Sequence, residues 1–160
     1  MNLEEKEWLE QFCKEAQKKR KQSKYDILVP ISGGKDGTYL LWYLSTHTNL
    51  KILAFHIDNY YVTDTARMNV EEVCKKLDCD LEIVRPSWKK IQDFYKELML
   101  LNGEICIACE MMISLYPMDC AIAYNIPYIA WGLTPTQISV KKIKSGYLDI
   151  DYPYYDKIAN

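Results

Sequence analysis

Apolar residues along the chain follow two patterns in alternation, short continuous runs and helical spacing. The short runs have the length and composition of strands buried in a parallel sheet. Apolar positions at helical spacing, with polar positions between them, are typical of amphipathic helices. Together the patterns predict helices over residues 3–22, 38–50, 63–77, 88–101 and 116–124, and strands over residues 26–31, 51–57, 81–84 and 126–131.

This order of elements predicts an α/β fold, a three-layer α/β/α sandwich with a mostly parallel, Rossmann-like sheet. The length of 160 residues suits a single domain. Residues 1–24 would supply an N-terminal amphipathic helix, and residues 25–160 the α/β domain. A composition of 49% hydrophobic and 26% charged residues excludes a disordered chain.

The turn after the first predicted strand has the composition of a phosphate-binding loop. It reads Ser-Gly-Gly-Lys-Asp-Gly-Thr over residues 32–38. Adjacent glycines let the backbone approach an anion closely, and the first N–H groups of the next helix point at it. Lys35 adds a positive charge, and Ser32 and Thr38 add hydroxyl groups. The loop is not a Walker A motif, because Asp36 follows the lysine, and it contains no Gly-x-Gly-x-x-Gly.

Two other positions lie just beyond predicted strands. Asp58 follows the second strand, and Gly132 follows the fourth. The carboxyl ends of parallel strands meet at one edge of the sheet, where open α/β sheets bind ligands. We therefore expect both residues to lie near the loop of residues 32–38 and to form one nucleotide site with it.

A pair of cysteines, Cys106 and Cys109, is separated by two residues. Two thiolates at this spacing can bind one metal ion, but zinc sites and iron–sulfur clusters usually need three or four ligands. Cys120 is the candidate third ligand. The alternative is that the pair consists of ordinary reduced thiols. The six cysteines of the chain are better explained as thiols or metal ligands than as disulfides.

The loop of residues 32–38, placed after a first strand, resembles the signature of the PP-loop ATP pyrophosphatases, Ser-Gly-Gly-x-Asp-Ser/Thr. Three further features are similar to the N-acetyl sugar amidotransferase branch of these enzymes: the Cys-Ile-Ala-Cys run, the Tyr-Pro at 116–117 and the Asn-Ile-Pro at 125–127 that leads to Trp-Gly at 131–132. The resemblance covers about residues 26–135.

The resemblance implies an ATP-binding transferase or ligase that uses Mg²⁺ and cleaves ATP to AMP and pyrophosphate. It implies that a substrate oxygen on a nucleotide-linked N-acetyl sugar is adenylated, and that ammonia from a glutaminase partner displaces AMP. The implied catalytic residues are Lys35, which neutralises charge on the leaving phosphates, and Asp36, which binds Mg²⁺. The implied nucleotide-binding residues are Ser32, Gly33, Gly34, Gly37 and Thr38 around the pyrophosphate, His56, Ile57 and Asp58 near adenine and ribose, and Gly132. For His56, packing within the strand is the ordinary alternative.

Two alternative functions stay open. The tRNA and nucleobase thiolation branch also carries a Cys-x-x-Cys, used for an iron–sulfur cluster such as 4Fe–4S or for sulfur handling, and takes sulfur from a donor protein. Its usual Gly-His-x-x-Asp-Asp is absent here, where Gly-Leu-Thr-Pro-Thr stands at residues 132–136. The other alternative is a nucleotide-binding module without turnover. Gly37 stands where the family usually has serine. Family members commonly continue past the fourth strand, so we expect a minimal form, a fragment, or a chain whose substrate site is supplied by a partner.

Charge and hydropathy bear on the binding partners and the cellular location of the protein. A net charge of −2 and a pI near 5.7 argue against broad nucleic-acid binding, which disfavours tRNA as a partner. The charged N-terminus lacks the apolar segment of a signal peptide, and no uninterrupted apolar run approaches the roughly 18 residues of a membrane span. We therefore expect a cytoplasmic protein that acts on a small-molecule substrate, with zinc or an iron–sulfur cluster as candidate groups at the cysteine pair.

Overall fold

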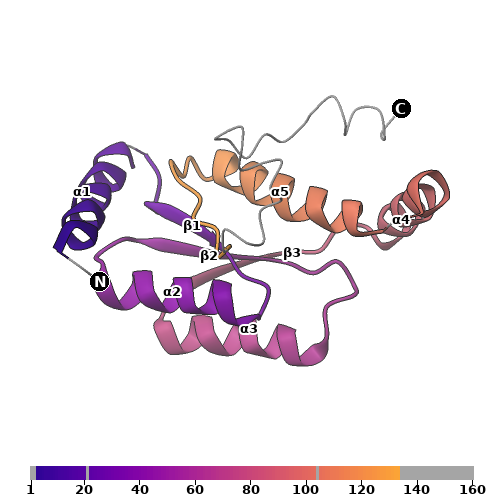
Figure 1. Cartoon of the computed structure of the whole chain (residues 1–160), viewed down its shortest axis with the longest axis horizontal. Helices are drawn as coiled ribbons and strands as arrows, with labels where there is room; N and C mark the ends of the chain where they lie inside the picture. The colour runs from indigo at the N-terminus through magenta and orange to yellow at the C-terminus, as the bar shows by residue number, and fades with distance from the viewer. Residues whose placement is uncertain (1–2, 21, 104, 134–160) are drawn as a thin grey trace.

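The computed structural model describes residues 3–20, 22–103 and 105–133 (Figure 1). The end of the predicted α/β domain, residues 134–160, lies outside the described residues. The elements are α1 (Leu3–Lys19), β1 (Ile27–Pro30), α2 (Lys35–His47), β2 (Ile52–Ile57), α3 (Asp64–Leu77), β3 (Asp80–Val84), α4 (Trp88–Asn102) and α5 (Cys106–Ala123).

The strands form a parallel sheet in the order β1-β2-β3. The predicted fourth strand, residues 126–131, is reduced to one parallel bridge on the outer side of β1. There the Leu28 N–H donates to the Tyr128 carbonyl, and the Ala130 N–H donates to the Leu28 carbonyl, both at 2.9 Å. The next donor on this side of β1 would be residue 30, but Pro30 has no N–H. The ladder therefore ends after a single bridge.

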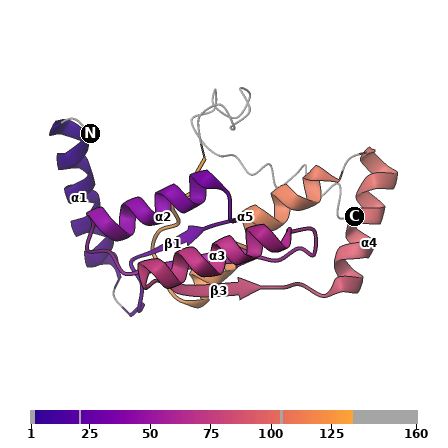
Figure 2. The ribbon, with the colours of Figure 1, turned by 90° about the horizontal axis from the view of Figure 1, so that it is seen from below.

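Helices cover both faces of the sheet (Figure 1). α2 and α3 lie side by side on one face (Figure 2), and α5 packs on the other. Because side chains alternate along a strand, Ile27 and Val29 of β1 join the core under α2 and α3, and Leu28 joins the core under α5. The predicted three-layer α/β/α sandwich with a parallel sheet is confirmed.

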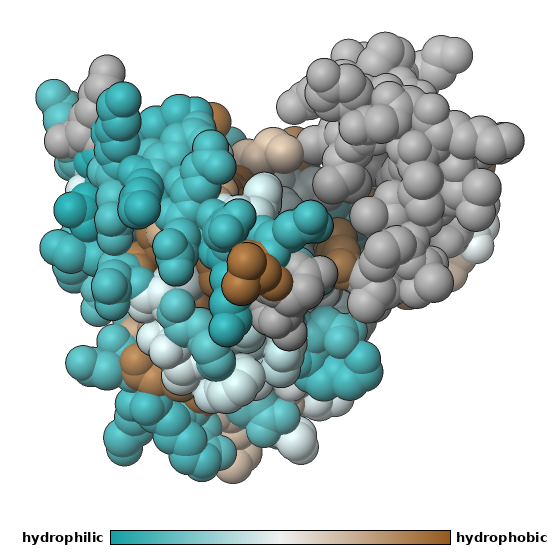
Figure 3. Space-filling model, turned by 60° about the vertical axis from the view of Figure 1, so that its left-hand side comes forward, coloured by the Kyte–Doolittle hydropathy of each residue, from teal (hydrophilic) through white to brown (hydrophobic). Residues whose placement is uncertain are grey.

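The N-terminal helix shares the first of these cores. Ala16 of α1 is fully buried there, and the ring of Phe12 packs edge-on against Tyr128, with ring centroids 5.2 Å apart. On the face where α1 comes forward, the described residues are mostly hydrophilic (Figure 3). The acidic first turn and basic last turn of α1 complement the helix dipole, as the sequence pattern predicts.

α4 packs against α5 and lies beyond the edge of the sheet (Figure 1). Ile91 and Leu98 of α4 form a third core with Ala108 and Met112 of α5. α4 ends as predicted, with Gly103 in the left-handed conformation as its C-cap (φ 68°).

α5 begins ten residues earlier than predicted, because residues 106–115 are apolar on nearly every side and show no helical period. By length and composition alone, α5 is the one described helix that could cross a membrane. In the described structure it packs against α4 and the sheet. Met112 packs against α4, and Cys120 and Ala121 pack against β1 and β2.

Candidate functional site

A cavity of about 250 Å³ opens at the carboxyl ends of β1 and β2. Five of the residues that line it were predicted as nucleotide ligands from the sequence: Ser32, Gly37, His56, Ile57 and Gly132. The remaining lining residues are Pro30, Ile31, Phe55, Asn59, Val62, Ile113, Pro117, Trp131 and Leu133. Segments far apart in the sequence therefore meet at the edge of the sheet where the site was expected.

Gly33 is the most constrained position of the loop. Its backbone has a φ of +82°, and a Cβ atom at this position would lie 2.2 Å from the carbonyl oxygen of Ala66 in α3. The side-chain amide of Asn69, also in α3, donates to the Gly33 carbonyl at 3.3 Å. Only glycine satisfies both the backbone conformation and the contact. The loop is therefore held against α3 by direct backbone packing.

A second close approach joins the loop to the segment that follows α5, at Gly132. A Cβ atom at Gly132 would lie 2.8 Å from both the Cα and the N of Gly37. The backbones of these two glycines are thus in contact, which brings the segment after residue 130 over the first turn of α2. At Gly37 itself, a Cβ atom would lie 3.3 Å from the Pro30 carbonyl, so glycine is also the residue that fits most easily there.

The first turn of α2 presents backbone donors that are not paired within the helix. Gly34 is the N-cap and makes no side-chain cap hydrogen bond, and the first intrahelical bond joins the Thr38 N–H to the Gly34 carbonyl at 3.3 Å. The N–H groups of residues 35–37 precede that bond and have no partner within the helix. α2 also begins three residues earlier than predicted, so Lys35 and Asp36 belong to its first turn.

Lys35 and Asp36 form an ion pair with each other. The Lys35 Nζ lies 2.7 Å from the Asp36 Oδ1, and the lysine side chain is 88% exposed. Beside them, on the α3 side of the loop, is a groove of about 450 Å³ whose lining includes Thr38, Asn69 and Lys76. The loop therefore has the cavity on one side and the groove on the other. It carries the Lys35 cation, the Asp36 carboxylate and N–H groups that are not paired within the helix. This donor set suits a magnesium-bound phosphate chain.

His56 is buried, with 1% of its surface exposed. Its Nδ1 lies 2.9 Å from the Ile31 carbonyl, which can only accept, so in the neutral ring Nδ1 carries the proton and Nε2 is an acceptor. Nε2 is buried and has no hydrogen-bond partner among the described residues. An unsatisfied buried acceptor costs roughly 1–3 kcal/mol, which a donor on a bound ligand would recover.

Asp58 does not line the cavity. Its buried carboxylate accepts from Arg67 Nε at 3.2 Å, from Arg85 Nε at 3.1 Å and from the Tyr60 N–H at 3.0 Å. Burial raises the pKa of Asp58, but the Arg85 hydrogen bonds, the Tyr60 N–H and the charges of both arginines outweigh it and leave the pKa below its ordinary value. Asp58 thus forms ion pairs with two arginines, Arg67 and Arg85.

We expect Asp58→Asn to lower the free energy of unfolding at neutral pH by roughly 1–3 kcal/mol, because hydrogen bonds to a charged group are lost. Since the folded pKa lies below the unfolded value, the Asp58 contribution is present above about pH 4 and disappears as the pH falls further. Urea unfolding between pH 3 and 7 should show this loss in the wild type and not in the variant. Asp64→Asn is the matched control, since Asp64 also pairs with Arg67 but is 91% exposed.

One cysteine of the pair, Cys109, lies next to a residue that lines the cavity. The Cys109 Sγ is 2.9 Å from the Tyr95 hydroxyl and 3.5 Å from the side-chain nitrogen of Asn59, which lines the cavity. Cys106 is the first residue of α5 and is exposed. One side chain therefore separates the Cys109 sulfur from the candidate nucleotide site.

Cys120 does not join this pair. It lies eleven residues beyond Cys109 on the same helix, about 16 Å along the axis. It is buried beside Leu28 and Phe55, and burial raises the pKa of its thiol to about 11. Among the described residues, no group of three His, Cys, Asp or Glu side chains could hold a metal ion. The two cysteines alone do not fit a zinc site or a cluster, and the expectation for Cys120 is corrected.

The residues that sequence analysis missed are mainly apolar walls of the cavity. Asn59 adjoins the predicted Asp58, and Trp131 adjoins the predicted Gly132, so both carried a positional signal. Val62 and Ile113 had none, because apolar residues in a loop or a helix look the same whether they face a core or a ligand.

The structure resembles solved structures of two enzymes. One is the U34-tRNA thiolase NcsA from Methanococcus maripaludis with its 4Fe–4S cluster (TM-score 0.57, 20% identity, 87% of this chain and 52% of that chain covered). The other is the NH3-dependent NAD synthetase from Campylobacter jejuni subsp. jejuni in complex with the nitrate ion (TM-score 0.55, 17% identity, 92% and 61% covered). The chain shares its fold with both enzymes.

This shared fold agrees with the one implied by the resemblance to the PP-loop enzymes. At 20% and 17% identity the likeness concerns the fold alone. The chain spans about half of the thiolase chain and about three-fifths of the synthetase chain. No protein-family model matches the sequence, and no curated protein matches it.

Proposed function

We propose that this chain binds ATP with Mg²⁺ and cleaves it to AMP and pyrophosphate, adenylating an oxygen of an acceptor. We propose as the acceptor a nucleotide-linked N-acetyl sugar, with ammonia from a glutaminase partner displacing AMP, in the cytoplasm. The observation that carries the proposal is the pair of glycine contacts, Gly33 on α3 and Gly132 on Gly37. They hold an uncapped helix N-terminus between a cavity and a polar groove.

The roles of the side chains follow from their positions. The N–H groups of residues 35–37 and the Ser32 and Thr38 hydroxyls would bind the phosphates, and Lys35 would stabilise negative charge on the departing pyrophosphate. Asp36 would hold Mg²⁺, which neutralises phosphate charge when bound. His56 Nε2 would accept a hydrogen bond from the nucleoside. Cleavage of this kind needs positioning and electrostatic stabilisation more than covalent help.

One observation favours a second function, the adenylating transfer of sulfur to tRNA or a nucleobase. The Cys109 sulfur contacts Asn59, and Asn59 lines the cavity. A thiol at this place lies where a sulfur donor would have to reach an adenylated acceptor. The described residues supply only the two cysteines of the pair, so we assign no cluster to them.

Product analysis tests both proposals. The protein is incubated with ATP, Mg²⁺ and either a UDP-linked N-acetyl sugar with ammonium, or unmodified tRNA with sulfide, and the nucleotides are separated by chromatography. We expect AMP and pyrophosphate in the first mixture. If AMP and pyrophosphate form in the tRNA mixture and not in the sugar mixture, sulfur transfer is favoured. ADP and phosphate in either mixture would contradict adenylation. ATP that binds but stays uncleaved in both would indicate a binding module.

A further inference from the structure

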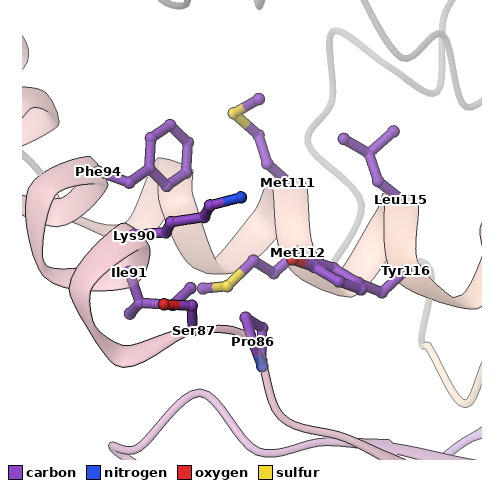
Figure 4. A pocket seen from close by; sticks show the side chains of 9 residues that line it. All are labelled: Pro86, Ser87, Lys90, Ile91, Phe94, Met111, Met112, Leu115 and Tyr116. Atoms are coloured by element: carbon purple, nitrogen blue, oxygen red, sulfur yellow. The ribbon is translucent and has the colours of Figure 1, made fainter.

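A second pocket, of about 440 Å³, lies between α4 and α5 (Figure 4). Its floor is apolar and consists of Ile91 and Phe94 from α4 and Met111, Met112 and Leu115 from α5. The pocket is distinct from the cavity described above. That cavity meets α5 at residues 113 and 117, and this pocket meets it at residues 111, 112, 115 and 116.

Lys90 supplies the polar element of the pocket. Its side chain extends from α4 across the opening toward Met111 and Met112 (Figure 4). Within the described part of the chain its ammonium group has no ion-pair partner, and the first turn of α4 contains no acidic residue. The Ser87 hydroxyl, which also lines the pocket, makes no cap hydrogen bond. Within the described part of the chain, an exposed cation without an ion-pair partner and an exposed hydroxyl group therefore line a pocket whose floor is apolar.

The local charge pattern is unfavourable without an anion. Lys89 and Lys90 stand in the first turn of α4, where a positive charge opposes the helix dipole. A negative charge placed beside Lys90 would offset part of this unfavourable interaction. The apolar floor, by contrast, favours a hydrocarbon or aryl group, and flexible methionine side chains adapt to its shape.

We propose that this pocket binds a small amphiphilic carboxylate, with its acyl or aryl tail among Phe94, Met111 and Met112 and its carboxylate on Lys90 and Ser87. Pockets of roughly 300–1,000 Å³ with apolar walls and a few polar groups are typical of small-molecule sites. The volume of this pocket falls within that range. The site is separate from the nucleotide cavity, so the proposal stands independently of the function proposed above.

The test uses sodium octanoate as the probe and ¹³C-methyl methionine NMR as the readout. We expect a saturable shift of the Met111 and Met112 methyl signals, assigned by single Met→Leu variants. Met68 and Met99 are exposed on other surfaces and serve as internal references. Equal shifts at all four methyl groups, or no saturation at Met111 and Met112, would overturn the proposal.

Charge variants test the role of Lys90. Lys90→Met should bind octanoate roughly tenfold more weakly, the loss expected for a hydrogen bond to a charged group. Lys90→Arg keeps the charge and should retain most of the affinity. Lys89→Met is the matched control, since Lys89 belongs to the same turn but does not line the pocket. If Lys90→Met binds octanoate as tightly as the wild type and Lys90→Arg do, the assignment is wrong.

Discussion

Asp36→Ala is expected to reduce pyrophosphate release from ATP by at least about 10³-fold while leaving the fold intact. The carboxylate lies in the first turn of α2, beside the free N–H groups and paired with Lys35. Its proposed partner, Mg²⁺, binds mainly through carboxylate and phosphate oxygens. Losing one preorganised electrostatic contact of this kind commonly costs 10²–10³-fold in rate, and loss of the metal would add to that.

The stability change should be small, because an acidic residue in the first turn contributes only about 0.3–1 kcal/mol through the helix dipole. Two measurements separate the outcomes, pyrophosphate release and the dependence of ATP affinity on Mg²⁺. The variant should lose both the turnover and the Mg²⁺ dependence. Asp64→Ala, which removes a first-turn acid from the neighbouring α3, should change neither. Turnover close to the wild-type rate in Asp36→Ala would remove Asp36 from the mechanism.

Gly33→Ala is expected to lower the free energy of unfolding by roughly 2–5 kcal/mol and to abolish ATP binding. Two costs add together. Alanine is strained at a φ of +82°, and its methyl group would overlap the backbone of Ala66, which as part of a helix cannot move aside locally. Relief requires the loop to separate from α3, and that movement would displace the N–H groups at the start of α2.

Gly34→Ala provides a close comparison. Gly34 has an ordinary φ of −83°, and an added Cβ would meet only the Ser32 hydroxyl, at 3.4 Å. We expect a loss of about 1 kcal/mol or less from the weaker N-cap. Urea unfolding and calorimetric titration with a non-hydrolysable ATP analogue report both quantities. Similar stabilities of the two alanine variants would show that the Gly33 contact with α3 does not constrain the loop.

The sequence was sufficient for the fold because the buried strands and amphipathic helices have clear periods. β1 and β2 lie within one residue of their predicted starts and ends. The start of α5 was missed because an almost wholly apolar segment has no period. The short fourth strand was overestimated because Pro30, which limits its pairing, belongs to a different segment.

The site was predictable only where local chemistry marks it. The glycine loop was identified from seven consecutive residues, and its place at the carboxyl edge followed from the parallel sheet. The need for glycine at residue 33 could be foreseen from the loop, but the carbonyl of Ala66 that enforces it lies in a helix thirty-three residues away. The partners of Asp58 could not be foreseen for a related reason, since Arg67 and Arg85 reach it from later segments.

Pro30 has a consequence for the shape of the cavity. An ordinary residue at this position could donate to the segment after α5 and keep that segment aligned with β1 for another hydrogen bond. Proline cannot, so the chain leaves the sheet after Ala130 and turns over the first turn of α2, where Gly132 meets Gly37. The missing N–H of Pro30 thus accounts for the place where the chain leaves the sheet and begins to line the cavity, at Trp131 and Gly132.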